Sequence, residues 1–126
     1  MKRSICAGFT LVEVLTVIAI IALLAALILG LAGNAQKTAA RKKALAEITQ
    51  LESFITDYQM KYGQVPQSVA ALKAELVAKN HSLSNMVDPW GMSYEYTNSS
   101  KATFYLWSKG GSTNNDSSMY IGNATN

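Results

Sequence analysis

The chain has 126 residues, which is the length of one ordinary domain and excludes a large multidomain enzyme. Hydrophobic residues make up 49% of it, charged residues only 15%, and the net charge is +3. The single cysteine, Cys6, excludes an intramolecular disulfide and a zinc site of several thiolates. A lipid anchor on Cys6 is also excluded, because no apolar stretch precedes it.

The segment from Val14 to Gly33 carries no charged side chain and predicts a membrane-spanning helix. Twenty residues at about 1.5 Å each cover the roughly 30 Å of a bilayer core, whereas the apolar region of a signal peptide is shorter. Basic residues flank the segment, Lys2 and Arg3 before it and a cluster over residues 37–43 after it. Such clusters beside an apolar span are typical of headgroup contacts, so we expect no nucleic-acid partner.

A distinctive motif lies between the basic leader and the apolar segment, where residues 8–13 read Gly-Phe-Thr-Leu-Val-Glu. A carboxylate inside a membrane helix is costly, about 2.5 to 3.5 kcal/mol at its centre, and needs a partner. The motif resembles, without a departure, the cleavage and methylation motif of type IV prepilins and type II secretion pseudopilins. The resemblance implies that a prepilin peptidase cuts between Gly8 and Phe9 and that Phe9 is N-methylated. It also implies that Glu13 pairs with the Phe9 amine of a neighbouring subunit.

Charge counting and this resemblance predict opposite orientations in the membrane. Two Lys or Arg residues precede the span and four follow it, so the positive-inside rule places the C-terminal part in the cytoplasm. The family's peptidase works on the cytoplasmic side, which requires the leader to be there. We therefore expect a single-pass protein of the bacterial inner membrane, with a cytoplasmic N-terminus and a periplasmic head.

The apolar pattern continues beyond Gly33 as a stripe at helical spacing, which predicts an amphipathic helix. No proline occurs before Pro66, so one helix can run from about Phe9 to Tyr62, with Gly63 as its C-terminal cap. The residues of the stripe are Leu45, Ile48, Leu51, Ile55, Tyr58 and Tyr62.

The remaining residues predict a small head with one helix and a β-hairpin. The helix opens at Pro66 and Ser68 and continues to Asn80 and His81. Strands are expected over Ser93–Thr97 and Ala102–Ser108, with one face on the stripe. The apolar positions are Val69, Leu72, Leu76 and Val77 in the helix, and Tyr94, Tyr96, Phe104 and Leu106 in the strands. The predicted fold class is α+β, and its long helix and small head resemble the pilin fold.

This organisation divides the chain into four predicted parts. Residues 1–8 form the leader peptide, and residues 9–33 form the transmembrane and assembly helix. Residues 34–63 continue that helix in amphipathic form, and residues 64–126 form the periplasmic head.

The turn Asp88-Pro89-Trp90-Gly91, followed by a strand and then Ser108-Lys109-Gly110, resembles the major, G-type pseudopilin of type II secretion. This resemblance implies a structural subunit of a homo-oligomeric periplasmic filament that drives protein secretion. Its implied partners are the prepilin peptidase, minor pseudopilins and an inner-membrane assembly platform. A surface pilus subunit for adhesion, motility or DNA uptake is an alternative, as is a plain membrane-anchored binding head.

The major pseudopilins order their C-terminal loop with calcium, but this chain keeps one carboxylate there, Asp116. Calcium takes six to eight oxygen ligands, several of them charged for tight binding. Asp116, Asn114 and Ser117 are the candidate ligands, with Asn115, the Ser118 hydroxyl in place of Ser117, and backbone carbonyls near Ser108 as further oxygens. A metal-free polar loop is the alternative. The sequence has no P-loop, dinucleotide fingerprint or metal-ligating histidine pair, so we expect no enzyme.

Overall fold

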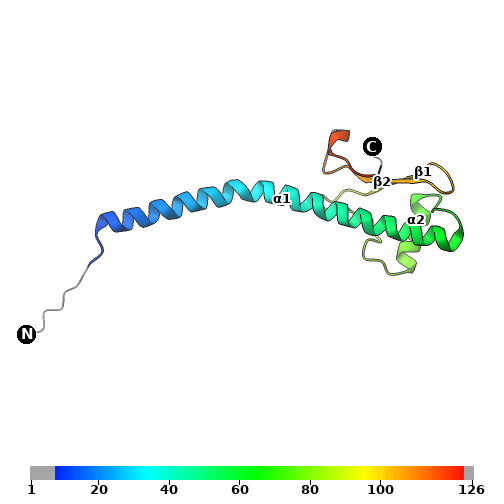
Figure 1. Ribbon diagram of the computed structural model, residues 1–126, viewed down its shortest axis with the longest axis horizontal. Coiled ribbons are helices and arrows are strands. Elements are labelled where there is room, and N and C mark those ends of the chain that lie inside the picture. The colour runs from blue at the N-terminus through cyan, green and yellow to red at the C-terminus, as the bar shows by residue number, and fades with distance from the viewer. Residues whose placement is uncertain (1–7, 124–126) are drawn as a thin grey trace, which may run out of the picture. The chain divides into compact units, whose positions relative to one another are not determined.

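The computed structural model describes residues 8–123, which form two compact units divided after Lys37. Residues 1–7, most of the predicted leader, lie outside the described residues, and the four predicted parts stay predictions. The elements, in chain order, are α1 (Leu11–Tyr62), α2 (Val69–Ala78), β1 (Glu95–Asn98), β2 (Phe104–Ser108), a short 3-10 helix (Ser117–Met119) and β3 (Ile121–Gly122) (Figure 1).

The first unit holds the apolar part of α1. Within residues 8–123, α1 is the one helix long and apolar enough to cross a membrane, with a mean hydropathy of 3.1 over its best 18-residue window. None of that window is buried. A helix that is apolar all round needs lipid or protein neighbours to cover it. The helix begins at Leu11, two residues later than predicted from Phe9.

In the second unit, α1 buries a stripe that differs from the predicted one. The buried side chains of α1 are Ala44, Ile48, Leu51 and Ile55. Leu45 and Tyr62 were predicted on the stripe, but 55% and 48% of their surfaces are exposed. Successive residues of a helix point about 100° apart, so Ala44 and Leu45 cannot both face one core. The small Ala44 takes the inward position, and the predicted stripe is wrong at Leu45 and Tyr62.

The end of α1 agrees with the predicted cap. Gly63 has φ 72°, the left-handed conformation that glycine adopts without a Cβ penalty. Its N–H donates to the Gln59 carbonyl at 2.8 Å, which satisfies one of the carbonyls left free at the helix end.

The helix α2 begins where Ser68 caps it, since the Ser68 side chain accepts from the Ala71 N–H at 3.1 Å. Leu72 and Leu76 are buried as predicted. Val77 is 60% exposed, so its predicted core position is wrong. The helix ends at Ala78, before the predicted Asn80, which has φ 51° and therefore leaves the helical region.

The three strands form an antiparallel sheet in the order β1-β2-β3. The predicted hairpin is confirmed with shorter strands, and its register pairs Tyr96 with Leu106. The third strand was not predicted; it pairs Ser108 with Ile121. A two-residue strand that follows a long polar segment has no periodicity from which it could be recognised.

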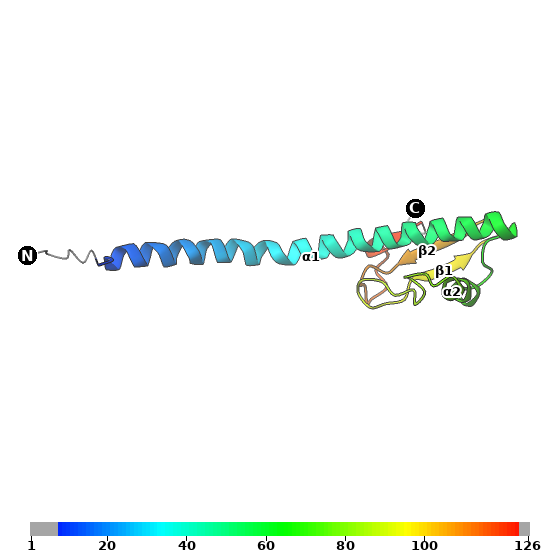
Figure 2. The ribbon, with the colours of Figure 1, turned by 90° about the horizontal axis from the view of Figure 1, so that it is seen from below.

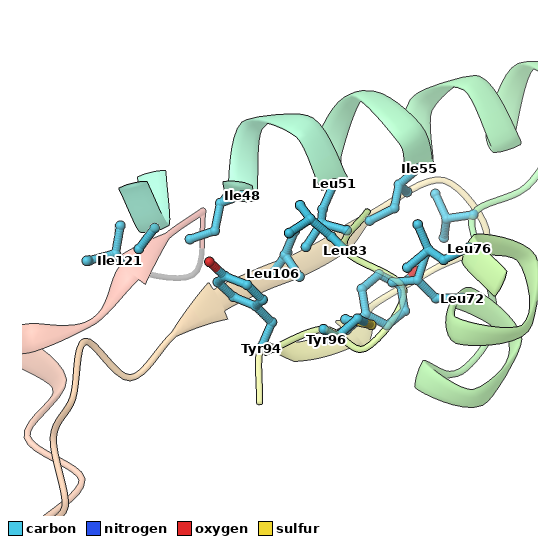
Figure 3. Close-up of a cluster of buried hydrophobic side chains, with 13 residues drawn as sticks. Ile48, Leu51, Ile55, Leu72, Leu76, Leu83, Tyr94, Tyr96, Leu106 and Ile121 are labelled. Carbon is cyan, nitrogen blue, oxygen red and sulfur yellow. The ribbon is translucent and has the colours of Figure 1, made fainter. Parts of the chain in front are cut away.

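The core lies between α1, α2 and the inner face of the sheet (Figure 3). In Figure 2 the sheet and α2 lie alongside the part of α1 that follows Thr38. Two buried phenols connect these layers, because Tyr94 donates to a carboxylate oxygen of Glu47 and Tyr96 donates to the Pro66 carbonyl at 2.6 Å. Burial raises the pKa of Tyr96 to about 12 and also raises the pKa of Tyr94, which keeps both phenols protonated as donors.

Candidate functional site

The N-terminal motif forms a capping box at the start of α1. The Glu13 N–H donates to the Thr10 hydroxyl, and the Thr10 N–H donates to Oε2 of Glu13, both at 3.2 Å. This reciprocal pair satisfies two of the N–H groups that a helix start leaves free. The box holds the carboxylate at the positive end of the helix dipole, where an anion is favoured. The role of Thr10 was missed in the sequence, although Thr-x-x-Glu before an apolar run is the signal for it.

Phe9 and Glu13 lie around a shallow hollow beside the first turns of α1. The hollow has a volume of about 390 Å³, and its other lining residues are Val14, Val17 and Ile18. Phe9 is 87% exposed. The hollow is thus apolar except for one carboxylate. Its chemistry suits an apolar segment that carries a single cation, since a charge in such surroundings needs an opposite charge.

Gly8 has no packing reason to be glycine in this chain. A Cβ built there would meet no atom within 4 Å, and the backbone does not adopt a positive φ. A requirement for glycine at this position would therefore reflect recognition by another protein rather than the fold of this one.

In the head, the Asp88 carboxylate holds a turn together. Asp88 is 4% exposed, and its Oδ1 accepts from the N–H groups of Trp90 at 3.1 Å and Met92 at 2.8 Å. Its Oδ2 accepts from the Ser108 hydroxyl at 2.7 Å. The Ser108 Oγ in turn accepts from the Gly110 N–H at 3.1 Å. The turn and the end of β2, which resembled a family signature, are thus joined through one buried carboxylate.

The three candidate calcium ligands lie in the exposed segment after β2. The Asp116 side chain accepts from the N–H and hydroxyl of Ser118, at 3.0 and 2.7 Å, and from neither Asn114 nor Ser117. The Asp116 N–H donates to the buried Ser112 hydroxyl at 2.9 Å. Ser112 was missed because a serine in a serine-rich loop gives no pattern, whereas Ser118 was predicted only as an alternative to Ser117 for a calcium ligand. Calcium binding by Asp116, Asn114 and Ser117 stays a prediction.

The hydrogen bonds from Ser118 lower the pKa of Asp116 below its ordinary value of 3.8. A carboxyl whose pKa is lower in the folded chain than in the unfolded chain stabilises the fold at pH values above its unfolded-chain pKa. That stabilisation is lost as the pH falls through its folded-chain pKa. We therefore expect the protection of the Ser118 amide, its exchange rate relative to that of an unstructured amide at the same pH, to fall below about pH 4, and Asp116→Asn to remove this dependence. Hydrogen exchange measured across pH 3 to 6 checks this.

Two family models match this chain and together cover most of its length. Residues 32–123 match the family model described as Type II secretion system (T2SS), protein G, and residues 3–29 match the Prokaryotic N-terminal methylation motif. The chain belongs to the type II secretion system protein G family.

The similar proteins bear the name Type II secretion system core protein G, and three of them illustrate the match. The protein of Pectobacterium carotovorum subsp. carotovorum is 36% identical over 72% of this chain and 66% of its own length. That of Klebsiella pneumoniae is 33% identical over 70% of this chain and 71% of its own length. That of Vibrio cholerae is 33% identical over 71% of this chain and 68% of its own length. No solved structure is significantly similar to the chain.

Family membership confirms the predicted resemblance and the predicted class of function, a pseudopilin subunit of type II secretion. It disfavours the two alternatives, a surface pilus subunit and a plain anchored head. The family is a structural one and is not known for catalysis.

The methylation motif covers residues 8–13 and implies processing by a prepilin peptidase and assembly into a pilus-like filament. The single apolar helix of the described residues fits membrane anchoring.

Proposed function

We propose that this chain is stored in the inner membrane, cleaved after Gly8, methylated at Phe9 and then assembled as the repeated subunit of a secretion pseudopilus. The head is periplasmic, and minor pseudopilins and an inner-membrane platform are its assembly partners. The methylation motif at residues 3–29, together with the protein G match, carries this proposal.

The geometry at residues 8–13 supports a charge pair between two subunits, with the cation on Phe9 of one and the anion on Glu13 of the other. Cleavage frees an amine on Phe9, with an ordinary pKa of about 7.7 to 8.0, so it is mostly protonated at neutral pH. The capping box holds Glu13 beside an apolar hollow. The carboxylate of one subunit then neutralises the amine of another as their helices pack. Such a pair fixes the axial register between apolar helices that otherwise have little to specify it.

The processing step is tested by the intact mass of the full chain co-expressed with a prepilin peptidase. We expect the wild type to lose residues 1–8 and gain one methyl group. Gly8→Ala should remain uncut, and because a Cβ at this position would meet no atom of the chain itself, the block would report lost recognition by the peptidase. Thiol labelling gives a second readout, since Cys6 is the only cysteine and leaves with the leader. A wild-type chain that keeps Cys6 beside a control prepilin that is processed would refute the proposal.

The orientation needs its own test, because charge counting predicts the reverse. Ser99 is exposed in the turn between β1 and β2, so Ser99→Cys offers a thiol on the head. In intact cells whose outer membrane is permeable to the reagent, a maleimide that cannot cross the inner membrane should label this cysteine. Labelling only after the inner membrane is broken would place the head in the cytoplasm.

A further inference from the structure

The segment over residues 109–120 is closed on itself by side-chain hydrogen bonds. Near its start, the Ser112 N–H donates to the Lys109 carbonyl at 3.0 Å. Ser112 is only 5% exposed, and its hydroxyl accepts from the Asp116 N–H at 2.9 Å. The Asp116 carboxylate then caps the short 3-10 helix by accepting from the N–H and hydroxyl of Ser118. Ser112 thus connects the first half of the loop to Asp116, and the Asp116 carboxylate binds the second half through Ser118.

The same segment is also fixed from outside. Arg41 of α1 reaches it and donates from Nη1 to the Met119 carbonyl at 3.3 Å. Gly110, with φ 63°, lies so close to the Met119 carbonyl that any Cβ would collide with it. Gly111, with φ 79°, packs on the indole of Trp90, 2.8 Å from where its Cβ would be. These two glycines allow an approach of the backbone that no other residue would fit.

The side chains present do not fit a tight calcium site. Calcium needs six to eight oxygens, several of them charged, and the segment offers one carboxylate, Asp116. The nearby Asp88 already accepts on both of its oxygens. Among residues 8–123, no three His, Cys, Asp or Glu side chains are grouped so that they could hold a metal ion.

We propose that the Ser112–Asp116–Ser118 network replaces the metal, so that the head of this subunit orders its C-terminal loop without calcium. Ordering a loop costs conformational entropy whether a metal or internal hydrogen bonds close it. In this chain, hydrogen-bond donors and acceptors of the loop itself offset that cost. The folding part of the inference is independent of the proposed function, and only its extension to assembly rests on it.

The first test is the response of the full chain, in detergent, to calcium. Trp90 and Trp107, the only tryptophans, both belong to the head, so near-ultraviolet circular dichroism follows the unfolding of the head alone. We expect the same melting temperature, within about 1 °C, in excess chelator and in calcium well above the roughly 0.1 to 1 mM at which extracellular modules bind it. Calcium at 100 times its Kd would raise stability by about 2.7 kcal/mol and the melting temperature by several degrees. A rise of that size would overturn the proposal.

Variants separate the two ways of closing the loop. Ser112→Ala and Asp116→Ala should raise amide exchange over residues 109–119 at least tenfold, by the same factor in chelator and in calcium. Asn114→Ala and Ser117→Ala are the matched controls, because these are exposed candidate calcium ligands whose side chains make no hydrogen bond within residues 8–123. They should leave exchange unchanged. Exchange that rises in the controls, or that responds to Asp116→Ala only with calcium present, would refute the network.

The same preparations distinguish this inference from the proposed function. A head that melts several degrees higher in calcium, on a chain that is still cleaved and methylated, would refute only the metal-free loop. If the melting temperature of the head does not change with calcium but the chain keeps residues 1–8, only the proposed cleavage and methylation are refuted.

Discussion

Leu51→Ala is expected to destabilise the head by about 2 to 5 kcal/mol, the cost of emptying a buried leucine site. Leu51 is fully buried between α1 and the sheet, where it lies with Ile48 and Leu106 (Figure 3). Packed interiors relax only partly around a removed side chain, so the loss of contacts adds to the loss of apolar burial.

Leu45→Ala is the matched control for this substitution. It makes the same chemical change on the same helix, but Leu45 is 55% exposed, and we expect a cost below about 1 kcal/mol. Both free energies come from urea unfolding of the full chain in detergent, followed by the signal of Trp90 and Trp107. Equal costs for the two variants would mean that the stripe predicted from the sequence, rather than the one in the structure, faces the core.

Asp88→Ala is the second substitution with a large expected effect, about 3 to 5 kcal/mol. It removes the acceptor of three donors at once, the N–H groups of Trp90 and Met92 and the hydroxyl of Ser108. A buried donor left without a partner costs about 1 to 3 kcal/mol. The total is held below the sum, because the Ser108 hydroxyl can rotate and water can enter the space.

Asp88→Asn should cost less, about 1 to 2 kcal/mol, since its carbonyl keeps the two N–H bonds and its amide can donate to the Ser108 Oγ. Asp57→Ala is the control, because Asp57 is an exposed acid of α1 in the same unit, and its cost should stay within about 0.5 kcal/mol. Urea unfolding gives these values, and hydrogen exchange at Trp90, Met92 and Gly110 gives a local readout. An Asp88→Ala chain as stable as Asp57→Ala would contradict the role of this carboxylate.

The site at the N-terminus was largely readable from the sequence, and the head loop was not. Residues 8–13 form a continuous local motif, and both bonds of the capping box join residues three apart. The contact between Arg41 and Met119 joins residues 78 apart, and the bond between Ser108 and Asp88 joins residues 20 apart. A family resemblance singled out the segments of Asp88 and Ser108 but not the bond between them, and no periodicity predicts such pairings, because they depend on where the chain returns after several turns.

The sequence by itself determined the elements that depend on neighbours along the chain. The apolar run, the start motif, the glycine cap at Gly63 and the alternation of Tyr94 with Tyr96 all act within a few residues, so composition and spacing reveal them. Only the tertiary structure decided which of two adjacent residues, Ala44 or Leu45, enters the core. The reason is that packing against a sheet selects one direction around the helix, and a stripe of similar apolar residues leaves that direction undetermined.

The tertiary structure also decided the strand β3 and the closure of the loop before it. The two-residue strand β3 pairs with β2, which precedes it by more than ten residues. Ser112 accepts from the Asp116 N–H and Ser118 donates to the Asp116 carboxylate, in a segment where two glycines let the backbone lie close to Met119 and Trp90. Local propensity selects the residues of such a loop, and non-local packing selects their partners.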